Sequence, residues 1–214
     1  MRQHVNPLSQ FFQLPLSLPS NSILFRNSHH PIHIDIGSAK GEFLIELALK
    51  YPDWNFLGLE IREPLVSSSE RKRKKLKLEN LKFLFCNVNV SLDKWLSDLD
   101  FDQLKRVSIQ FPDPWFKRKH FKRRVLKTSL INSIARYMSK DGEIFIQSDI
   151  LALIESMTHV MDNSTYFNRN YLHGSKCLDK NPYNASTDRE LFVAKKNLPI
   201  YRAIYIRNSK LFIN

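Results

Sequence analysis

From residue 32 onward, short apolar runs alternate with longer segments in which apolar residues recur at helical spacing. The short runs predict five β-strands, at residues 32–36, 55–60, 81–86, 107–110 and 143–147. The longer segments predict helices at residues 40–51, 63–77, 92–99, 124–138 and 150–162. Pro52 ends the first of these helices, and Gly142 is expected to mark the end of the fourth.

The alternation of strands and helices is typical of a mainly parallel sheet with helices on both faces, the doubly wound α/β class. Two further apolar runs, at residues 192–193 and 203–207, predict an antiparallel hairpin at the sheet edge and bring the expected total to seven strands. Residues 32–214 are therefore expected to form one domain. Residues 1–31 contain four prolines and are expected to be an irregular N-terminal extension.

The 214 residues carry a formal net charge of +12, and 43% of them are hydrophobic, which is enough for a full core. Much of the positive charge lies in two blocks, at residues 71–77 and 117–124. Such clusters indicate a polyanionic partner, nucleic acid before membrane, although the first block could equally be a solvated helix surface. No apolar run reaches membrane-spanning length, and no membrane partner is expected.

Cys86 and Cys177 are far apart and form no CxxC motif, so neither a disulfide framework nor a structural zinc site is expected. No metal is expected either, because no ligand spacing is recognisable among His4, His29, His30 and His33. The first 34 residues contain no acid, as in a transit peptide, but their prolines favour an N-terminus that stays part of the protein. A bacterial cytoplasm or a plastid stroma would suit such a chain.

The segment 111–117, with the sequence FPDPWFK, follows the fourth predicted strand. Its prolines end that strand and stiffen the loop, because each fixes φ and lacks an N–H donor. Asp113 is thereby held at the carboxyl end of a strand, where open α/β sheets bind their ligands. With the basic residues that follow, the loop suits a flat, polar base on a polyanion. Trp115 could stack on that base or fill the core, and Phe116 is expected in the core.

The first strand runs into the segment 35–43, DIGSAKGEF, whose Gly37 and Gly41 permit tight turns and a close ligand. Neither GxGxxG nor GK[ST] occurs, so no strong phosphate cradle is expected. Glu60, at the end of the second strand, is spaced to accept hydrogen bonds from ribose hydroxyls. Together these features favour a nucleoside ligand such as S-adenosylmethionine, whose positive end Asp35 could balance. Asp35 could instead merely cap the loop.

Taken together, these motifs resemble the tRNA (guanine-N7)-methyltransferase family, over most of the chain. The resemblance is carried by Asn87 and by the segments 35–37 (DIG), 40–41 (KG), 56–62 (FLGLEIR), 111–117 (FPDPWFK), 122–124 (KRR), 148–149 (SD) and 187–190 (TDRE). It is closest to cyanobacterial and algal-plastid members, whose opening residues are similar to segment 4–8 (HVNPL). Ala39 departs from a glycine that many members have, which is tolerable if φ stays negative. Asn87 and Arg189 replace a common acid and an aromatic residue.

The resemblance implies a Rossmann-like class I methyltransferase that moves a methyl group from S-adenosyl-L-methionine to N7 of guanine 46 in the tRNA variable loop. It assigns Asp113 to the reaction centre. It also implies cofactor contacts from Asp35, Gly37, Gly41, Glu60, Ile61, Arg62, Asn87, Val88 and Asp113. Substrate contacts are implied for Lys117, Asp149, Thr187 and Glu190. Phosphate contacts are expected from Lys119, Lys122, Arg123 and Arg124. Asp149 could alternatively cap the helix at 150–162, and Glu190 could be a solvated charge. A monomer is expected, with a homodimer left open.

Guanine N7 carries a lone pair and no proton, so methylation there calls for alignment and electrostatic stabilisation, with no obligatory base. Asp113 is expected mainly to position the guanine. Three other readings remain. A nicotinamide-dependent oxidoreductase would need glycines that are absent, and a non-catalytic RNA-binding protein would not need an intact Pro-Asp-Pro loop. Another RNA methyltransferase, acting on rRNA or an exocyclic amine, would usually carry Asn/Asp-Pro-Pro-Tyr after the fourth strand.

Overall fold

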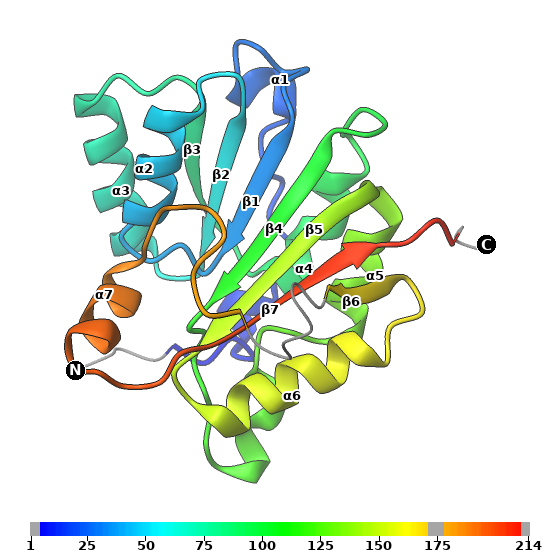
Figure 1. The fold of residues 1–214 in the computed structure, drawn as a ribbon. Coiled ribbons are helices and arrows are strands. Elements are labelled where there is room, and N and C mark those ends of the chain that lie inside the picture. The colour runs from blue at the N-terminus through cyan, green and yellow to red at the C-terminus, as the bar shows by residue number, and fades with distance from the viewer. Residues whose placement is uncertain (1–4, 171–177, 211–214) are drawn as a thin grey trace.

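The computed structural model describes residues 5–170 and 178–210, which form a seven-stranded sheet in the order β3-β2-β1-β4-β5-β7-β6 (Figure 1). Strands β1 to β5 are parallel, whereas β7 runs antiparallel to both β5 and β6. The strands are β1 Ile32–Ile36, β2 Asn55–Glu60, β3 Leu81–Phe85, β4 Leu104–Gln110, β5 Met138–Ser148, β6 Phe167–Asn170 and β7 Tyr201–Arg207. The predicted doubly wound, mainly parallel sheet with an antiparallel edge is confirmed.

Helices cover both faces of the sheet. On one face, α2 (Glu42–Lys50) and α3 (Glu63–Lys75) enclose one part of the core. On the other, α4 (Val88–Leu96), α5 (Thr128–Tyr137) and α6 (Leu151–Asp162) enclose the rest. Because both faces are covered, every residue of β1 and β2 is buried, as is usual for parallel strands. The remaining helices are α1 Asn21–Leu24 and α7 Asp188–Lys195, with 3₁₀ helices at Gln10–Gln13 and Arg118–Arg123.

The order of the strands creates a switch point between β1 and β4. After β1 the chain moves outward to β2 and β3, and it then returns to the opposite side of β1 to form β4 (Figure 1). The loops that follow β1 and β4 therefore diverge to opposite faces. In open sheets of this kind, ligands bind in the space between such loops.

Two helices begin four residues away from their predicted starts. Helix α4 begins at Val88, four residues early, because Asn87 caps it by accepting a hydrogen bond from the backbone N of Asn89 at 3.2 Å. Helix α5 begins only at Thr128, because the backbone is extended at Arg124 (φ −60°, ψ 142°) and at Lys127 (φ −132°, ψ 155°).

The expectation that Gly142 ends a helix is wrong, because Gly142 lies inside β5. The register between β4 and β5 shifts nearby, and the local backbone is tightly folded. A Cβ on Gly142 would lie 2.5 Å from Cγ of Met138 and 2.9 Å from the carbonyl oxygen of Ser139. The glycine therefore serves a close backbone approach within an irregular strand.

The predicted strand at 192–193 is also wrong, whereas the one at 203–207 is confirmed within β7. Residues 192–193 lie in α7, which Thr187 caps by accepting from the backbone N of Glu190 at 3.1 Å. The antiparallel neighbour of β7 on the outer side is β6, not a hairpin partner close in sequence. Its sequence, FNRN, has only one buried residue and gives almost no strand signal.

The N-terminal residues that the structure describes lie against α4. Trp95 Nε1 donates to the carbonyl oxygen of Pro19 at 2.8 Å, and the backbone N of Leu16 donates to Ser91 Oγ at 3.0 Å. Phe25 is buried in the core. Across residues 5–170 and 178–210, no helix has the length and apolar character needed to cross a bilayer.

Candidate active site

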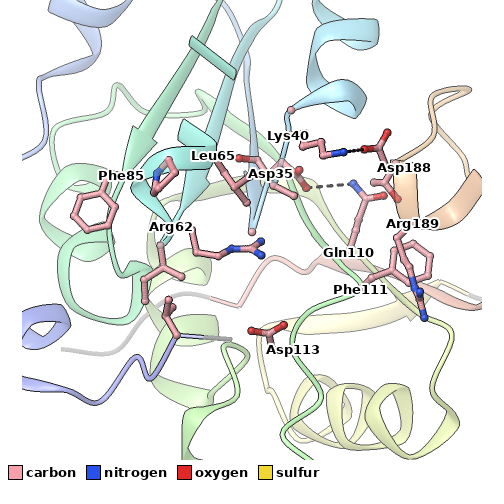
Figure 2. A pocket seen from close by; sticks show the side chains of 18 of the residues that line it. Asp35, Lys40, Arg62, Leu65, Phe85, Gln110, Phe111, Asp113, Asp188 and Arg189 are labelled. Atoms are coloured by element: carbon pink, nitrogen blue, oxygen red, sulfur yellow. Dashed lines mark hydrogen bonds and ion pairs between the residues drawn. The ribbon is translucent and has the colours of Figure 1, made fainter. Parts of the chain in front are cut away.

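A cavity of about 970 Å³ opens at the carboxyl ends of β1 and β4 (Figure 2). A smaller cavity of about 120 Å³ lies beside it and reaches toward Glu60 and the start of α4. The residues that line both include Gly37, Arg62, Gln110 and Asp113. The two cavities are thus compartments of one site at the switch point.

The loop after β1 turns at Gly37 (φ 81°) and Gly41 (φ 76°), both in the left-handed region that favours glycine. The backbone N of Gly37 donates to the carbonyl oxygen of Leu59 at 2.7 Å and ties the loop to β2. A Cβ on Gly41 would lie 2.4 Å from the ring of Phe83. These contacts bring bare backbone up to the large cavity.

The φ of Ala39 is +49°, whereas a negative value was expected. A residue with a Cβ pays roughly 1–2 kcal/mol for this conformation. The backbone N of Ala39 donates to Glu60 Oε2 at 3.0 Å, and its carbonyl oxygen accepts from Ser69 Oγ at 3.3 Å. These two hydrogen bonds hold the loop in the strained conformation.

Glu60 is buried at the end of β2 and lines the smaller cavity. Besides Ala39, it accepts from the backbone N and Nε of Arg62 at 3.0 Å each and from Nη2 of Arg62 at 3.1 Å. Burial lowers the pKa of Arg62, but the hydrogen bond and charge of Glu60, with a contribution from Asp113, raise it overall. Glu60 was expected to bind ribose hydroxyls, which remains a prediction; in the structure the guanidinium of Arg62 covers its carboxylate.

Asp35 is 3% exposed and lines the large cavity at the end of β1. Its Oδ1 accepts from Ser108 Oγ at 2.6 Å and from Gln110 Nε2 at 3.2 Å. Burial raises its pKa to about 6; the hydrogen bonds from Ser108 and Gln110 oppose that rise, and the charge of Glu60 adds to it. Since both side-chain donors are neutral, a positive ligand group beside Asp35 would be favoured.

A buried histidine forms a hydrogen bond with Ser108. His33 Nε2 lies 3.0 Å from Ser108 Oγ, and burial, with a smaller effect of Arg106, lowers the pKa of His33 to about 3. The single proton of Ser108 points to Asp35, so the neutral histidine must donate from Nε2. His33 therefore fixes the direction of the Ser108 hydroxyl.

Asn87 lines the smaller cavity, but its amide holds the N-terminal segment. Its Nδ2 donates to the carbonyl oxygens of Pro7 at 3.1 Å and Phe12 at 3.0 Å. Phe12 and Phe11 in turn line the large cavity. The N-terminal segment therefore forms one wall of the site. A contact between Asn87 and an adenine remains a prediction. Because Nδ2 of Asn87 already donates to Pro7 and Phe12, such a contact would have to use another atom of Asn87. Val88 and Ile61 also line the smaller cavity.

Asp113 lines both cavities from the loop after β4 (Figure 2). Phe111 (φ 47°) and Trp115 (φ 45°) lie on either side of it in left-handed backbone, so the loop is strained on both flanks. The backbone N of Phe111 donates to the carbonyl oxygen of Gln147 at 2.8 Å, and Arg124 Nε donates to that of Pro114 at 3.0 Å. The loop that carries Asp113 is therefore held rigidly at both ends.

The basic block divides into two groups. Arg123 and Arg124 are half-buried and support the loop: Arg123 lies 4.9 Å from the centre of the Trp115 ring. Lys117, Lys119 and Lys122 are exposed. Phe116 is 73% exposed, so its predicted place in the core is wrong; it follows Trp115, a left-handed residue (φ 45°), in a loop whose residues 117–119 are also exposed. An exposed aromatic ring thus lies among exposed lysines.

The two acids and the threonine expected to contact the substrate lie in different surroundings. Thr187 lines the large cavity together with Arg189. Asp149 forms an ion pair with Arg189, and Glu190 is buried in an ion pair with Arg202, 2.8 Å from Glu190 Oε1 to Nη2. Neither Asp149 nor Glu190 lines either cavity.

Sequence reasoning did not single out Gln110, Ser108, Arg189 or the N-terminal phenylalanines as site residues. Ser108 and Gln110 alternate in β4 with the apolar Val107 and Ile109, which would have given the signal once β4 was placed beside β1. No local motif marks the others. Among the described residues, no cluster of three His, Cys, Asp or Glu side chains could hold a metal ion.

A model of the family described as "Putative methyltransferase" matches residues 29–203. A tRNA (guanine-N(7)-)-methyltransferase of Prochlorococcus marinus (strain NATL1A) is 76% identical over 214 residues, which cover 100% of both chains. Proteins with the same name from P. marinus (strain MIT 9313) and Synechococcus sp. (strain CC9902) are 52% and 47% identical, covering 98% and 97% of this chain and 89% and 88% of their own lengths.

Solved structures resemble the fold. A precorrin-6y C5,15-methyltransferase from Geobacter metallireducens GS-15 has a TM-score of 0.53 at 16% identity and covers 87% of this chain and 86% of its own. An rRNA methylase from Streptococcus thermophilus has a TM-score of 0.53 at 11% identity, covering 88% and 92%. At these identities the likeness concerns the Rossmann-like methyltransferase fold alone.

Proposed function

Because this chain belongs to the tRNA (guanine-N7)-methyltransferase family, we propose that the two-compartment site beyond β1 and β4 is where a methyl group passes to N7 of a guanine in tRNA. The chain is a transferase that produces 7-methylguanosine, as its relatives are named. The observation that carries the proposed site is that Asp113 lines both compartments. A group at this junction can meet the donor from one side and the base from the other.

The methyl donor that fits the site is S-adenosyl-L-methionine, which supplies a methyl group on a positively charged sulfur. The buried Asp35, whose side-chain donors are neutral, supports a cationic ligand in the large compartment. Gly37 and Gly41 would let the backbone approach it, and Glu60, with Ile61, would hold the ribose once the guanidinium of Arg62 has turned away from the carboxylate. The smaller compartment, bounded by Asn87 and Val88, would enclose the adenine.

Asp113 acts on the guanine by position and charge. Its carboxylate would accept hydrogen bonds from N1–H and the exocyclic amine of guanine, which adenine does not offer in the same arrangement. This orients N7 toward the methyl group at near-attack distance. It also stabilises the positive charge that the purine acquires when N7 is alkylated. The reaction needs no proton to be removed from N7.

Thr187 and Lys117 would contact the substrate nucleotide directly. Asp149 and Glu190 would act through Arg189 and through the position of α7, since they are paired within the protein. The exposed Lys119 and Lys122 would bind tRNA phosphates, while Arg123 and Arg124 mainly shape the loop. We place the target in the variable loop, at position 46.

We further propose that the chain acts as a monomer in a bacterial cytoplasm, where its tRNA substrate is found. The cited relatives are cyanobacterial, which supports this location over a plastid stroma.

The test is to incubate unmodified tRNA with labelled S-adenosylmethionine and to analyse the nucleosides. We expect 7-methylguanosine alone, and none with Asp113→Ala. Asp53→Ala, which removes an exposed aspartate, is the matched control and should retain full activity. Methylation of an exocyclic amine or a ribose, or full activity of Asp113→Ala, would contradict the proposal.

A further inference from the structure

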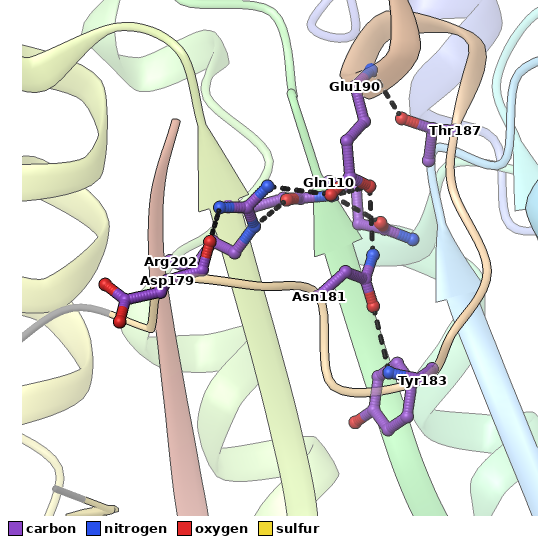
Figure 3. Close-up of polar contacts among 8 residues, drawn as sticks. Gln110, Asp179, Asn181, Tyr183, Thr187, Glu190 and Arg202 are labelled. Carbon is purple, nitrogen blue, oxygen red and sulfur yellow. Dashed lines mark hydrogen bonds and ion pairs between the residues drawn. The ribbon is translucent and has the colours of Figure 1, made fainter. Parts of the chain in front are cut away.

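We propose that Gln110 is a positioning residue for Asp35, and that Arg202 fixes the direction in which the Gln110 amide points. Gln110 donates to Asp35 and is linked to Arg202 through Gln147. This inference rests on the proposed function, because it gives Asp35 the methyl donor as its ligand. Figure 3 shows the part of the network around Gln110, Glu190 and Arg202.

The strand register brings these side chains into one row. Gln110 on β4 is the register partner of Gln147 on β5, and Gln147 is the partner of Arg202 on β7. Asp35 on β1 is the partner of Ser108, which lies two residues before Gln110 and therefore on the same face of β4. A polar row thus crosses four neighbouring strands at the edge where the site lies.

The chemistry of arginine sets the polarity of the row. A guanidinium can only donate hydrogen bonds, and Nε of Arg202 donates to Gln147 Oε1 at 3.0 Å. Gln147 must therefore turn its Nε2 the other way, where it donates to Gln110 Oε1 at 2.7 Å. Gln110 is left with Nε2 toward Asp35, at 3.2 Å from Oδ1. A flipped Gln110 would instead point its carbonyl oxygen at the carboxylate.

Burial makes this polarity costly to change. Gln147 is fully buried, and Gln110 and Arg202 are 7% and 8% exposed. Water cannot readily satisfy a flipped amide in such surroundings, so each flip would leave buried like groups facing each other. The row therefore behaves as a single oriented unit.

Glu190 holds the far end of the row. Its Oε1 accepts from Nη2 of Arg202 at 2.8 Å, and its Oε2 accepts from Nε2 of Gln147 at 3.1 Å and from Nδ2 of Asn181 at 2.9 Å (Figure 3). Nη1 of Arg202 donates to the carbonyl oxygen of Asp179 at 3.1 Å. The buried acid on α7 thus acts on the donor site through Arg202 and Gln147, although it lies outside both cavities.

The test measures binding of S-adenosylmethionine to the full chain by isothermal titration calorimetry. Gln110→Met should weaken binding about tenfold, the effect of losing one hydrogen bond to a charged group. Gln147→Met should weaken it about threefold, because Gln110 can then point either way. In the double variant the second substitution should add nothing, since Gln147 acts only through Gln110. Losses that simply multiply would overturn the proposal.

Variants of Arg202 provide a second test in the same binding assay. Arg202→Lys keeps a group that only donates and should bind the donor within about twofold of the unmodified chain. Arg202→Met should weaken binding by more than that but by no more than Gln147→Met does, because Glu190 Oε2 still accepts from Gln147 Nε2. Equal losses in both Arg202 variants would contradict a role in polarity. If Gln147→Met is unfolded at the assay temperature, Gln147→Asn, which is too short to reach both partners, replaces it.

Gln103→Met is the matched control. Gln103 is also buried, but it bonds to Asn21 and to the backbone of residues near His30, at the opposite end of β4. It should lower the melting temperature and leave donor affinity unchanged. If the unmodified chain bound no S-adenosylmethionine, the proposed function would fail; if it bound the donor and methylated tRNA while Gln110→Met bound equally well, only the present inference would fail.

Discussion

The guanidinium of Arg62 covers the carboxylate of Glu60, with Nε 3.0 Å from Oε1 and Nη2 3.1 Å from Oε2. The backbone N–H groups of Ala39 and Arg62 occupy one further position on each oxygen. A carboxylate has about four acceptor positions, so all of those on Glu60 are filled. A ribose hydroxyl can bond to Glu60 only when the guanidinium turns away.

Arg62→Met should therefore have opposite effects on stability and on binding. The variant leaves a buried carboxylate short of two donors, which should cost roughly 2 kcal/mol of unfolding free energy in the absence of ligand. Ribose hydroxyls would then bind without displacing a guanidinium, so the affinity for S-adenosylmethionine should rise severalfold. Denaturant unfolding and calorimetry measure the two effects. Weaker binding would mean that the guanidinium itself contacts the donor.

Asp35 should make donor binding depend on pH. Its pKa is raised to about 6, chiefly by burial, against opposing hydrogen bonds from Ser108 and Gln110 and with an added effect of Glu60. Since the ionised form attracts a cation, the dissociation constant of S-adenosylmethionine should fall as pH rises from about 5 to about 7. Asp35→Asn should bind weakly and without this dependence.

The same raised pKa should make the fold less stable at higher pH. Between the ordinary pKa of 3.8 and the folded value of about 6, the folded chain binds the proton that the unfolded chain has lost. Stability should therefore fall as pH rises through this window, by up to about 3 kcal/mol from this group. Asp35→Asn should accordingly melt at a higher temperature than the unmodified chain at about pH 8 and not at about pH 4. A lower melting temperature at both would contradict the burial argument.

Ala39→Gly should stabilise the protein. Its φ of +49° strains an alanine and is accessible to glycine, so the gain should be about 1 kcal/mol after the larger backbone entropy of unfolded glycine is subtracted. Thermal unfolding measures it. Ala48→Gly, in the interior of α2, is the control and should destabilise by about 1 kcal/mol or more. A loss of stability in Ala39→Gly would mean that the methyl group makes contacts worth more than the strain.

The outcome at Ala39 illustrates where sequence reasoning ends. Strands β1 (IHIDI) and β2 (NFLGLE) were predicted at their observed bounds because each is a short segment dominated by apolar residues, which tertiary contacts only reinforce. The φ of Ala39 depends instead on Glu60, twenty-one positions away in the chain, whose carboxylate holds the backbone N of Ala39. Likewise β6 forms because it pairs with β7, although its own sequence barely favours a strand.

The site divides in the same way. Asp35, Gly37 and Asp113 stand in local motifs at strand ends, so their place at the cavity could be predicted. The contacts of Gln110 depend on the registers of β4 with β1 and β5, which a single sequence does not specify. Glu190 was expected to face the substrate, but its partner Arg202 lies on a strand whose neighbours could not be assigned in advance.

The exposed lysines beside the Asp113 loop should carry tRNA affinity. Lys119→Ala with Lys122→Ala should weaken tRNA binding and reduce the slope of log affinity against log salt by about 1.5. The slope falls because binding releases fewer counterions when two phosphate contacts are lost. Lys74→Ala with Lys75→Ala, on exposed positions at the end of α3, removes the same charge from the other block and is the control. Filter binding over a range of salt concentrations measures both slopes. If tRNA contacts the surface at Lys119 and Lys122, the salt slope should change strongly in the first pair of substitutions and only slightly in the second. Equal changes in the two slopes would mean that only the net charge of the protein attracts tRNA.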